Sequence, residues 1–237
     1  LPESAFSYYA YGPERKNCSN LLYVSLPDGL TAIGEGAFLS SLNLRCINIP
    51  KTVKSIGKKA FDSCMRLGGA ITIPEGVTVI SDRTFFDCRL VTELNLPSTL
   101  ENLGDLSLCL IWDTYDPWPL TAVRINRKTP PVLLPADHMA FSSADGLYNV
   151  RFKNCTLYVP VGAKQAYESA EEWKEFPNIV ETPELDGGTS GIDAAEVETT
   201  AADKELKIYT LDGRYVGKDM DRLGKGVYVV GGRKVVR

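Results

Sequence analysis

Apolar and polar positions alternate over short segments that recur at a nearly fixed interval along the first half of the chain. Each segment ends in an apolar residue followed by proline, and successive prolines are 23, 24 and 23 residues apart: Pro27, Pro50, Pro74 and Pro97. The alternation predicts a short strand with one buried face, and proline ends it because its nitrogen cannot donate a hydrogen bond. A period of this length predicts a repeat architecture.

The other apolar positions of the unit keep their register in all four copies. They lie three residues before each proline, and three, six and eleven residues after it. The first two positions after proline predict a second short strand, and Gly34 or Gly57 then gives the backbone the freedom that a corner needs. We expect the following Ala-Phe pair in a helical turn, with Phe38, Phe61 and Phe85 aligned in the core. Stacked coils bury the apolar face that one coil cannot, so the sequence predicts a right-handed solenoid.

The pattern loosens after the fourth copy and then resumes. Segments 122–125 and 156–159 again read as strands with alternating apolar positions. Residues 162–176 predict a short helical cap in which Tyr167 and Trp173 cover the last coil, as the open end of a solenoid requires.

Two units carry a recognisable family pattern. Residues 24–38 contain Val-Ser-Leu-Pro, Ile-Gly and Ala-Phe, and residues 47–64 contain Ile-Asn-Ile-Pro, Ile-Gly and Ala-Phe-Asp-Ser-Cys. These units, together with the closing segment 157–180, resemble BspA-type leucine-rich repeats over about residues 1–181. The resemblance implies a β-rich leucine-rich repeat superhelix with short helical turns. It also implies an extracellular or cell-surface bacterial protein, since some members of the family are adhesins for host or matrix proteins.

The C-terminal part of the chain has a different character. Residues 182–203 are rich in Gly, Thr, Ala and Glu and predict a linker. Residues 204–237 alternate strand patterns with Asp-Gly and Gly-Gly turns, which predicts a small all-β module. The module resembles the C-terminal sorting domains of Bacteroidetes, which implies type IX secretion and attachment to the surface of a Gram-negative cell. It is shorter than a full sorting domain, so a β-appendage without that role stays open.

Composition excludes several classes of function. The chain has 26 Lys+Arg and 30 Asp+Glu, a net charge of −4, and no basic stripe for nucleic acid. No run approaches the ~18 apolar residues of a membrane span. No signal peptide is visible at Leu1, so we expect a mature or trimmed chain. The single histidine, His138, and the absence of a Cys-x-x-Cys pair argue against a metal site, a cofactor or an enzyme.

Three sets of residues are candidates for binding. Aromatic side chains in an insertion of the first coil, residues 8–16, and in the irregular coil after Leu108 either contact a partner or fill interruptions of the core. Outward positions on the first strand of each coil form the third set, because repeat proteins generally bind partners on such a face. The candidates are Tyr8, Tyr9, Tyr11, Trp112, Tyr115 and Trp118 in the insertions, and Tyr23, Asn48, Asn95 and Arg124, with Ser25, Thr72 and Glu93, on the strands.

Cysteines recur at one corner of the unit. Cys18, Cys64 and Cys88 lie nine or ten residues before the next proline. Cys64 and Cys88 are either packed as small buried residues or close enough for a disulfide, because adjacent coils lie ~5 Å apart.

The sequence therefore predicts a non-enzymatic exported protein that presents a repeat surface to an extracellular protein or glycan of the host or matrix. Two alternatives remain open. One is a structural spacer at the cell surface, and the other, less favoured, is a hydrolase that uses Asp137 and His138 in the irregular region 111–150.

Overall fold

The chain divides into two compact units, Leu1–Ser190 and Gly191–Arg237, and each is described by itself. A computed structural model describes most of the first unit and the four strands of the second. The described residues are 1–3, 5, 21–111, 119–134, 139–141, 152, 154–185, 208–210, 215–217, 227–230 and 233–236.

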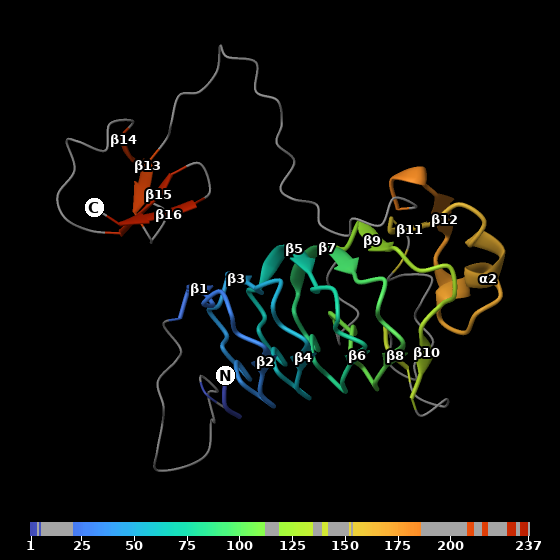
Figure 1. Ribbon diagram of the computed structural model, residues 1–237, viewed down its shortest axis with the longest axis horizontal. Helices are drawn as coiled ribbons and strands as arrows, with labels where there is room; N and C mark the ends of the chain where they lie inside the picture. Colours follow the sequence, from blue (N-terminus) through green and yellow to red (C-terminus); the bar gives the residue numbers. More distant parts are fainter. Residues whose placement is uncertain are drawn as a thin grey trace. The chain divides into compact units, whose positions relative to one another are not determined.

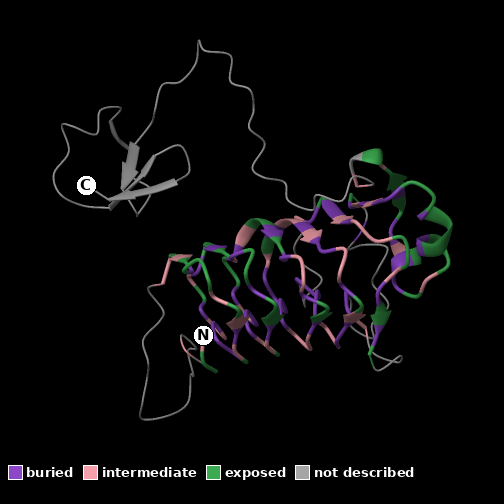
Figure 2. Ribbon diagram, in the orientation of Figure 1, coloured by how far each residue is buried: buried purple, intermediate pink, exposed green. Residues whose placement is uncertain are grey.

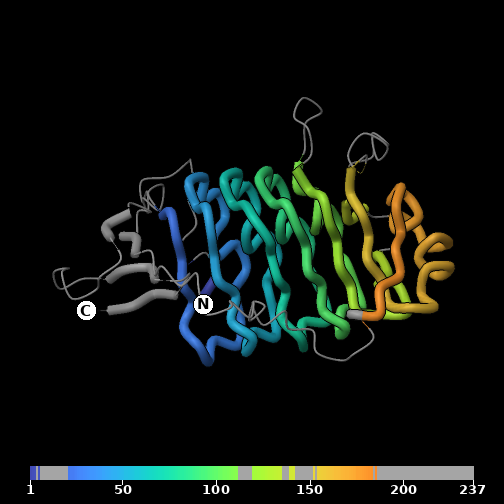
Figure 3. The backbone as a smooth tube through the Cα atoms, turned by 90° about the horizontal axis from the view of Figure 1, so that it is seen from above, coloured from blue at the N-terminus to red at the C-terminus, as the bar shows by residue number. Residues whose placement is uncertain are grey.

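The first wall of the solenoid consists of parallel strands that follow one another in chain order (Figures 1 and 3). β1 and β3 form one ladder, and β5, β7, β9, β11 and β12 form a five-stranded sheet. The predicted strands at 122–125 and 156–159 are confirmed, whereas β12 had no sequence prediction. The strands are β1 (Tyr23–Ser25), β3 (Cys46–Asn48), β5 (Gly68–Thr72), β7 (Leu90–Leu96), β9 (Ala122–Ile125), β11 (Thr156–Val159) and β12 (Asn178–Glu181).

The second wall is built from two-residue strands, as the apolar positions after each proline predicted. β2 pairs with β4, and β8 lies between β6 and β10, all in parallel. The last residue of each strand is apolar and buried, the class coloured purple in Figure 2. The strands are β2 (Ala32–Ile33), β4 (Ser55–Ile56), β6 (Val79–Ile80), β8 (Asn102–Leu103) and, beyond the predicted set, β10 (Val132–Leu133).

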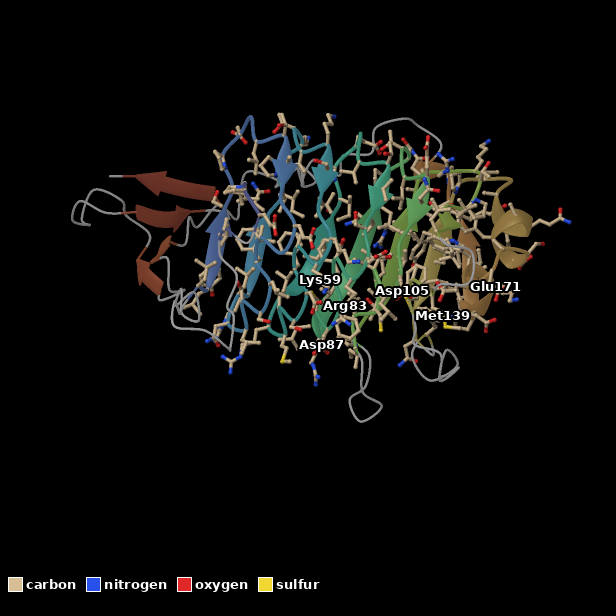
Figure 4. The ribbon with its side chains drawn as sticks, turned by 90° about the horizontal axis from the view of Figure 1, so that it is seen from below. Lys59, Arg83, Asp87, Asp105, Met139 and Glu171 are labelled. Atoms are coloured by element: carbon tan, nitrogen blue, oxygen red, sulfur yellow. The ribbon has the colours of Figure 1, made fainter. Side chains whose placement is uncertain are left out.

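The third side, which we call the turn wall, comprises residues 34–41, 57–64, 81–88 and 104–109. Figure 4 faces it, with Lys59, Arg83 and Asp105 labelled on three successive coils. Helical turns were expected here, but the described residues form consecutive turns without a helix. The reason is that Lys59, Arg83 and Leu106 have φ values of 55°, 53° and 51°, which break a right-handed helix.

Hydrogen bonds between coils hold the turn wall in this conformation. The N–H of Phe38 donates to the carbonyl of Ala60 at 2.8 Å, and the N–H of Phe61 donates to that of Thr84 at 2.9 Å. The N–H of Phe85 repeats the contact with the following coil. Every donor in this ladder therefore faces the C-terminal end, and the bonds help to offset the cost of about 1–2 kcal/mol for each left-handed residue.

The phenylalanines of the turn wall form a column, as predicted. The rings of Phe38 and Phe61 are stacked with centroids 5.3 Å apart, and those of Phe61 and Phe85 are 5.1 Å apart. All three side chains are fully buried. Leu108 continues the column, and Phe141 packs edge-on against Trp173 beyond it.

The predicted cap is confirmed. α2 (Lys164–Glu168) and η1 (Trp173–Glu175) cover the last coil, and η2 (Pro183–Leu185) follows β12. Tyr167 and Trp173 are buried, and each polar atom has a partner. The Tyr167 hydroxyl donates to the carbonyl of Arg127 at 2.9 Å, and the Trp173 ring N–H donates to that of Pro131 at 3.1 Å.

The open end of the turn-wall ladder meets a buried carboxylate. Glu172 is 1% exposed, and its Oε2 accepts the N–H groups of Ala140 at 2.6 Å and of Phe141 at 3.3 Å. Phe141 occupies the position that donates to a following coil elsewhere in the wall. Glu172 thus satisfies donors that would otherwise be buried without a partner.

The corner glycines have a different role from the one that the sequence suggested. Gly34, Gly57 and Gly104 lack the positive φ that only glycine adopts readily. Instead, a Cβ at Gly57 would lie 2.5 Å from the backbone nitrogen of Glu35, and one at Gly104 would lie 2.5 Å from that of Asp82. At Gly57 and Gly104 the neighbouring coil approaches too closely for a side chain, whereas the equivalent position of the third coil accommodates Ser81.

The second unit contains an antiparallel sheet in the order β14-β13-β15-β16. Its strands are β13 (Ile208–Thr210), β14 (Tyr215–Gly217), β15 (Val227–Val230) and β16 (Arg233–Val236). They fall in the segments where the sequence predicted strands.

Substitution Phe61→Ala should lower the free energy of unfolding by about 3–5 kcal/mol, because it opens a cavity between two stacked rings. Chemical denaturation followed by circular dichroism measures the change. Val79→Ala, at an exposed apolar position, serves as the control and should change it by less than about 0.5 kcal/mol. Equal effects of the two substitutions would contradict the core position of Phe61.

Substitution Gly57→Ala should destabilise the solenoid by about 1–3 kcal/mol, because the added Cβ forces two coils apart. Ser81 occupies the same position in the next coil and its hydroxyl lies 3.4 Å from the carbonyl of Ile56. Ser81→Ala keeps a Cβ there and should have little effect. Thermal unfolding of both variants compares them, and an unchanged Tm for Gly57→Ala would refute close approach as the reason for glycine.

Candidate binding surface

The outward side chains of the first wall form rows because the strands are parallel and in register. Thr72, Asn95, Arg124 and Tyr158 lie opposite one another on β5, β7, β9 and β11. The structure therefore brings together two of the predicted strand residues, Asn95 and Arg124. Both are half-buried.

Arg124 is held from two sides. Its Nη1 donates to Oε2 of Glu93 at 2.9 Å, and its guanidinium carbon lies 4.8 Å from the centroid of the Tyr158 ring. The side chains of Arg124 and Glu93 are 31% and 39% exposed, so the ion pair adds at most about 1 kcal/mol to stability. Its main effect is to orient a guanidinium whose other donors have no partner among the described residues.

Asn95 adds a polar group beside Arg124. Its Nδ2 donates to Oγ1 of Thr72 at 3.2 Å, and its Oδ1 is buried with no hydrogen-bond partner in the described part of the chain. A buried acceptor without a partner is uncommon in folded proteins. The hydrogen bond to Thr72 and the buried Oδ1 distinguish this row from an ordinary solvent-exposed face of a sheet.

Tyr23 and Asn48 lie at the other end of the same wall. Tyr23 is 45% exposed on β1, and Asn48 is exposed on β3 opposite Ser25. β1 and β3 form a ladder separate from the five-stranded sheet. The structure thus places the four strand candidates on one face but in two groups.

The remaining candidates lie outside the described residues. These are the two aromatic groups and the pair considered for hydrolysis: Tyr8, Tyr9, Tyr11, Trp112, Tyr115, Trp118, Asp137 and His138. Sequence reasoning overlooked Tyr158, although its place in the alternating strand 156–159 is the same signal that identified Arg124.

Comparison with protein families identifies the repeat. A model described as a BspA type leucine rich repeat region matches residues 15–109 in 6 copies. This part of the chain, less than half of its length, is therefore similar to BspA-type leucine-rich repeats. The match covers less of the chain than the resemblance suggested by the sequence, which extended to residue 181.

The comparisons with solved structures and with curated proteins do not extend the family match. A crystal structure of a leucine rich cell surface protein from Faecalibacterium prausnitzii A2-165 is similar at 15% sequence identity with a TM-score of 0.26. The alignment covers 78% of this chain and 64% of that one. No curated protein matches the chain.

Two open hollows lie on the solenoid away from the predicted strand residues. One, of about 280 Å³, lies on the second wall, and the other, of about 420 Å³, lies between β10 and the cap. The described residues contain no cluster of His, Cys, Asp and Glu that could hold a metal ion. No described helix is both long and apolar enough to span a bilayer.

The cysteines of the repeat region pack as small buried residues. The Cys64 thiol donates to the carbonyl of Phe38 at 3.1 Å and the Cys88 thiol to that of Phe61 at 3.2 Å, one coil back in each case. Both thiols are free, so no disulfide joins the pair. Burial raises the pKa of both thiols and raises the pKa of Cys155 to about 12.

At pH 8, iodoacetamide should label Cys46 in the folded protein and should label Cys64, Cys88 and Cys155 only after unfolding. Cys46 is exposed, whereas the other three are buried and their raised pKa values keep them protonated at this pH. Peptide mass spectrometry measures the extent at each site. Labelling of folded Cys64 as fast as Cys46 would contradict the packing.

Proposed function

We propose that the chain is a non-enzymatic, exported binding protein whose first wall contacts an extracellular partner, a protein or glycan of the host or matrix. The row of Thr72, Asn95, Arg124 and Tyr158 is the observation that carries the proposal. It combines amide, hydroxyl, guanidinium and aromatic groups on a rigid sheet. Arg and Tyr are the residue types that most often dominate binding energy at protein interfaces.

The repeat architecture supports a binding role over catalysis. The described coils bury their apolar residues in one core and place the alternate residues of each first-wall strand on the outer face. Repeat proteins generally use such a surface for recognition. The oriented but only partly paired guanidinium of Arg124 offers donors to a partner at little cost in conformational entropy.

The second unit supports placement outside the cell. Its antiparallel sheet belongs to the segment that resembles Bacteroidetes sorting domains. We propose secretion through a type IX route and association with the outer surface of a Gram-negative cell. A β-appendage without an export role remains the alternative.

The intact chain, applied to a printed glycan array and to immobilised matrix proteins, should bind at least one partner. The double substitution Arg124→Ala/Tyr158→Ala should weaken the Kd at least about tenfold, because it removes both anchor side chains of the row. Surface plasmon resonance measures the affinity for each partner found.

The matched control is Asn102→Ala/Val132→Ala on the outward face of the second wall, which should leave the Kd unchanged. Equal losses in both double variants would contradict the assignment of the first wall. Concentration-dependent self-association without any heterologous partner would instead favour the structural spacer.

A further inference from the structure

A second surface lies along the corner where the turn wall meets the first wall. In three successive coils this corner carries one exposed apolar side chain and one arginine. We call it the arginine ridge, and it comprises Leu42, Arg45, Met65, Arg66, Arg89 and Leu90. The apolar side chains Leu42, Met65 and Leu90 are 39%, 37% and 51% exposed.

Backbone contacts place the three coils of the ridge side by side. The N–H of Gly68 donates to the carbonyl of Arg45 at 3.1 Å, and Gly68 lies opposite Leu90 in the ladder between β5 and β7. Neighbouring strands are about 4.8 Å apart. The three coil segments that carry the arginines and the exposed apolar side chains are therefore neighbours along this corner.

Two of the three arginines of the ridge have no ion-pair partner in the described part of the chain. The guanidinium groups of Arg45 and Arg66 are exposed and have no ion-pair partner among the residues that the structure describes. By contrast, Arg83 pairs with Asp62 and Lys58 with Asp82 on or beside the turn wall, both at 2.8 Å. Neither Arg45 nor Arg66 therefore adds an ion pair to the stability of the described solenoid.

One arginine of the ridge is already neutralised. Asp87, labelled in Figure 4, is buried and pairs with Arg89 at 2.9 Å. It is the one acidic residue in segments 41–46, 64–69 and 87–91, which contain no lysine. Arginine, methionine and an absence of lysine and exposed acids are the composition that distinguishes protein interfaces from other surfaces.

Two uncompensated cations are too few for the other anionic partners. Nucleic-acid binding depends on the number of phosphates that Lys and Arg neutralise, and anionic membranes are bound through clusters of about 4–8 Lys or Arg. A short acidic segment of a protein needs only one or two guanidinium groups, because each can bind a carboxylate through two hydrogen bonds.

We propose that the arginine ridge docks a protein segment in which carboxylates alternate with apolar side chains. The carboxylates pair with Arg45 and Arg66, and the apolar side chains cover Leu42, Met65 and Leu90. The inference rests on the proposed role of the chain as a binding protein, and it concerns an edge distinct from the row around Arg124.

A fluorescein-labelled peptide that alternates Glu with Leu tests the ridge in the full-length chain by fluorescence anisotropy. The peptide should bind, and Arg45→Ala/Arg66→Ala should weaken its Kd at least about tenfold. Leu42→Ser/Met65→Ser should also weaken it. Lys51→Ala/Lys128→Ala removes the same charge elsewhere and should leave binding unchanged.

Several outcomes would overturn the proposal. If a peptide with Gln in place of Glu bound with the same Kd as the acidic peptide, the ridge would not recognise carboxylates. If polyglutamate bound with the same Kd, the apolar side chains of the ridge would not contribute to binding. Tighter ridge-dependent binding of phosphatidylglycerol vesicles or heparin would assign the ridge to a different partner. The first-wall proposal is tested with variants of Arg124 and Tyr158, which leave the ridge residues intact. A negative result for the ridge peptide can therefore be told apart from a negative result for the first wall.

Discussion

The spacing between neighbouring coils is the constraint on which the rest of the structure depends. Strand pairing on two walls, the hydrogen-bond ladder of the turn wall and the phenylalanine column all repeat at this one distance. The ring centroids of Phe61 lie 5.3 and 5.1 Å from those of its two neighbours, close to the separation of paired strands. A coil that departed from this spacing would lose all these interactions together.

The same constraint gives the solenoid two unlike ends. On the turn wall, the N–H groups that bridge coils face one direction, so the final coil presents donors and not acceptors. An apolar cap alone would leave these donors buried and unsatisfied. Glu172 meets this requirement with a carboxylate, while Tyr167 and Trp173 cover the core beside it. The cap is therefore matched to the polarity of the ladder as well as to its shape.

The sequence period predicted the parts of the fold in which every coil has the same kind of residue at the same position. Proline marked the ends of the first-wall strands, and phenylalanine marked the core column. The left-handed residues Lys59 and Arg83 could not be predicted, because their conformation is imposed by hydrogen bonds to the next coil rather than by side-chain type. β10 was missed because it begins 30 residues after its partner β8, outside the regular period. β12 begins 22 residues after β11, so the period could have identified it.

The binding surfaces were predicted unevenly for a related reason. Alternation within a strand identified Arg124 as outward-facing, but its contacts with Glu93 and Tyr158 depend on the register between strands. The arginine ridge escaped notice because its residues occupy slightly different positions in successive units and meet only at the corner. Stacking of the coils buries the core residues of each coil but leaves Leu42, Met65 and Leu90 exposed. Packing within the repeat therefore does not account for these three side chains. These exposed apolar side chains lie in or next to the coils that carry Arg45 and Arg66, and a partner that covers them would supply a physical reason for their exposure.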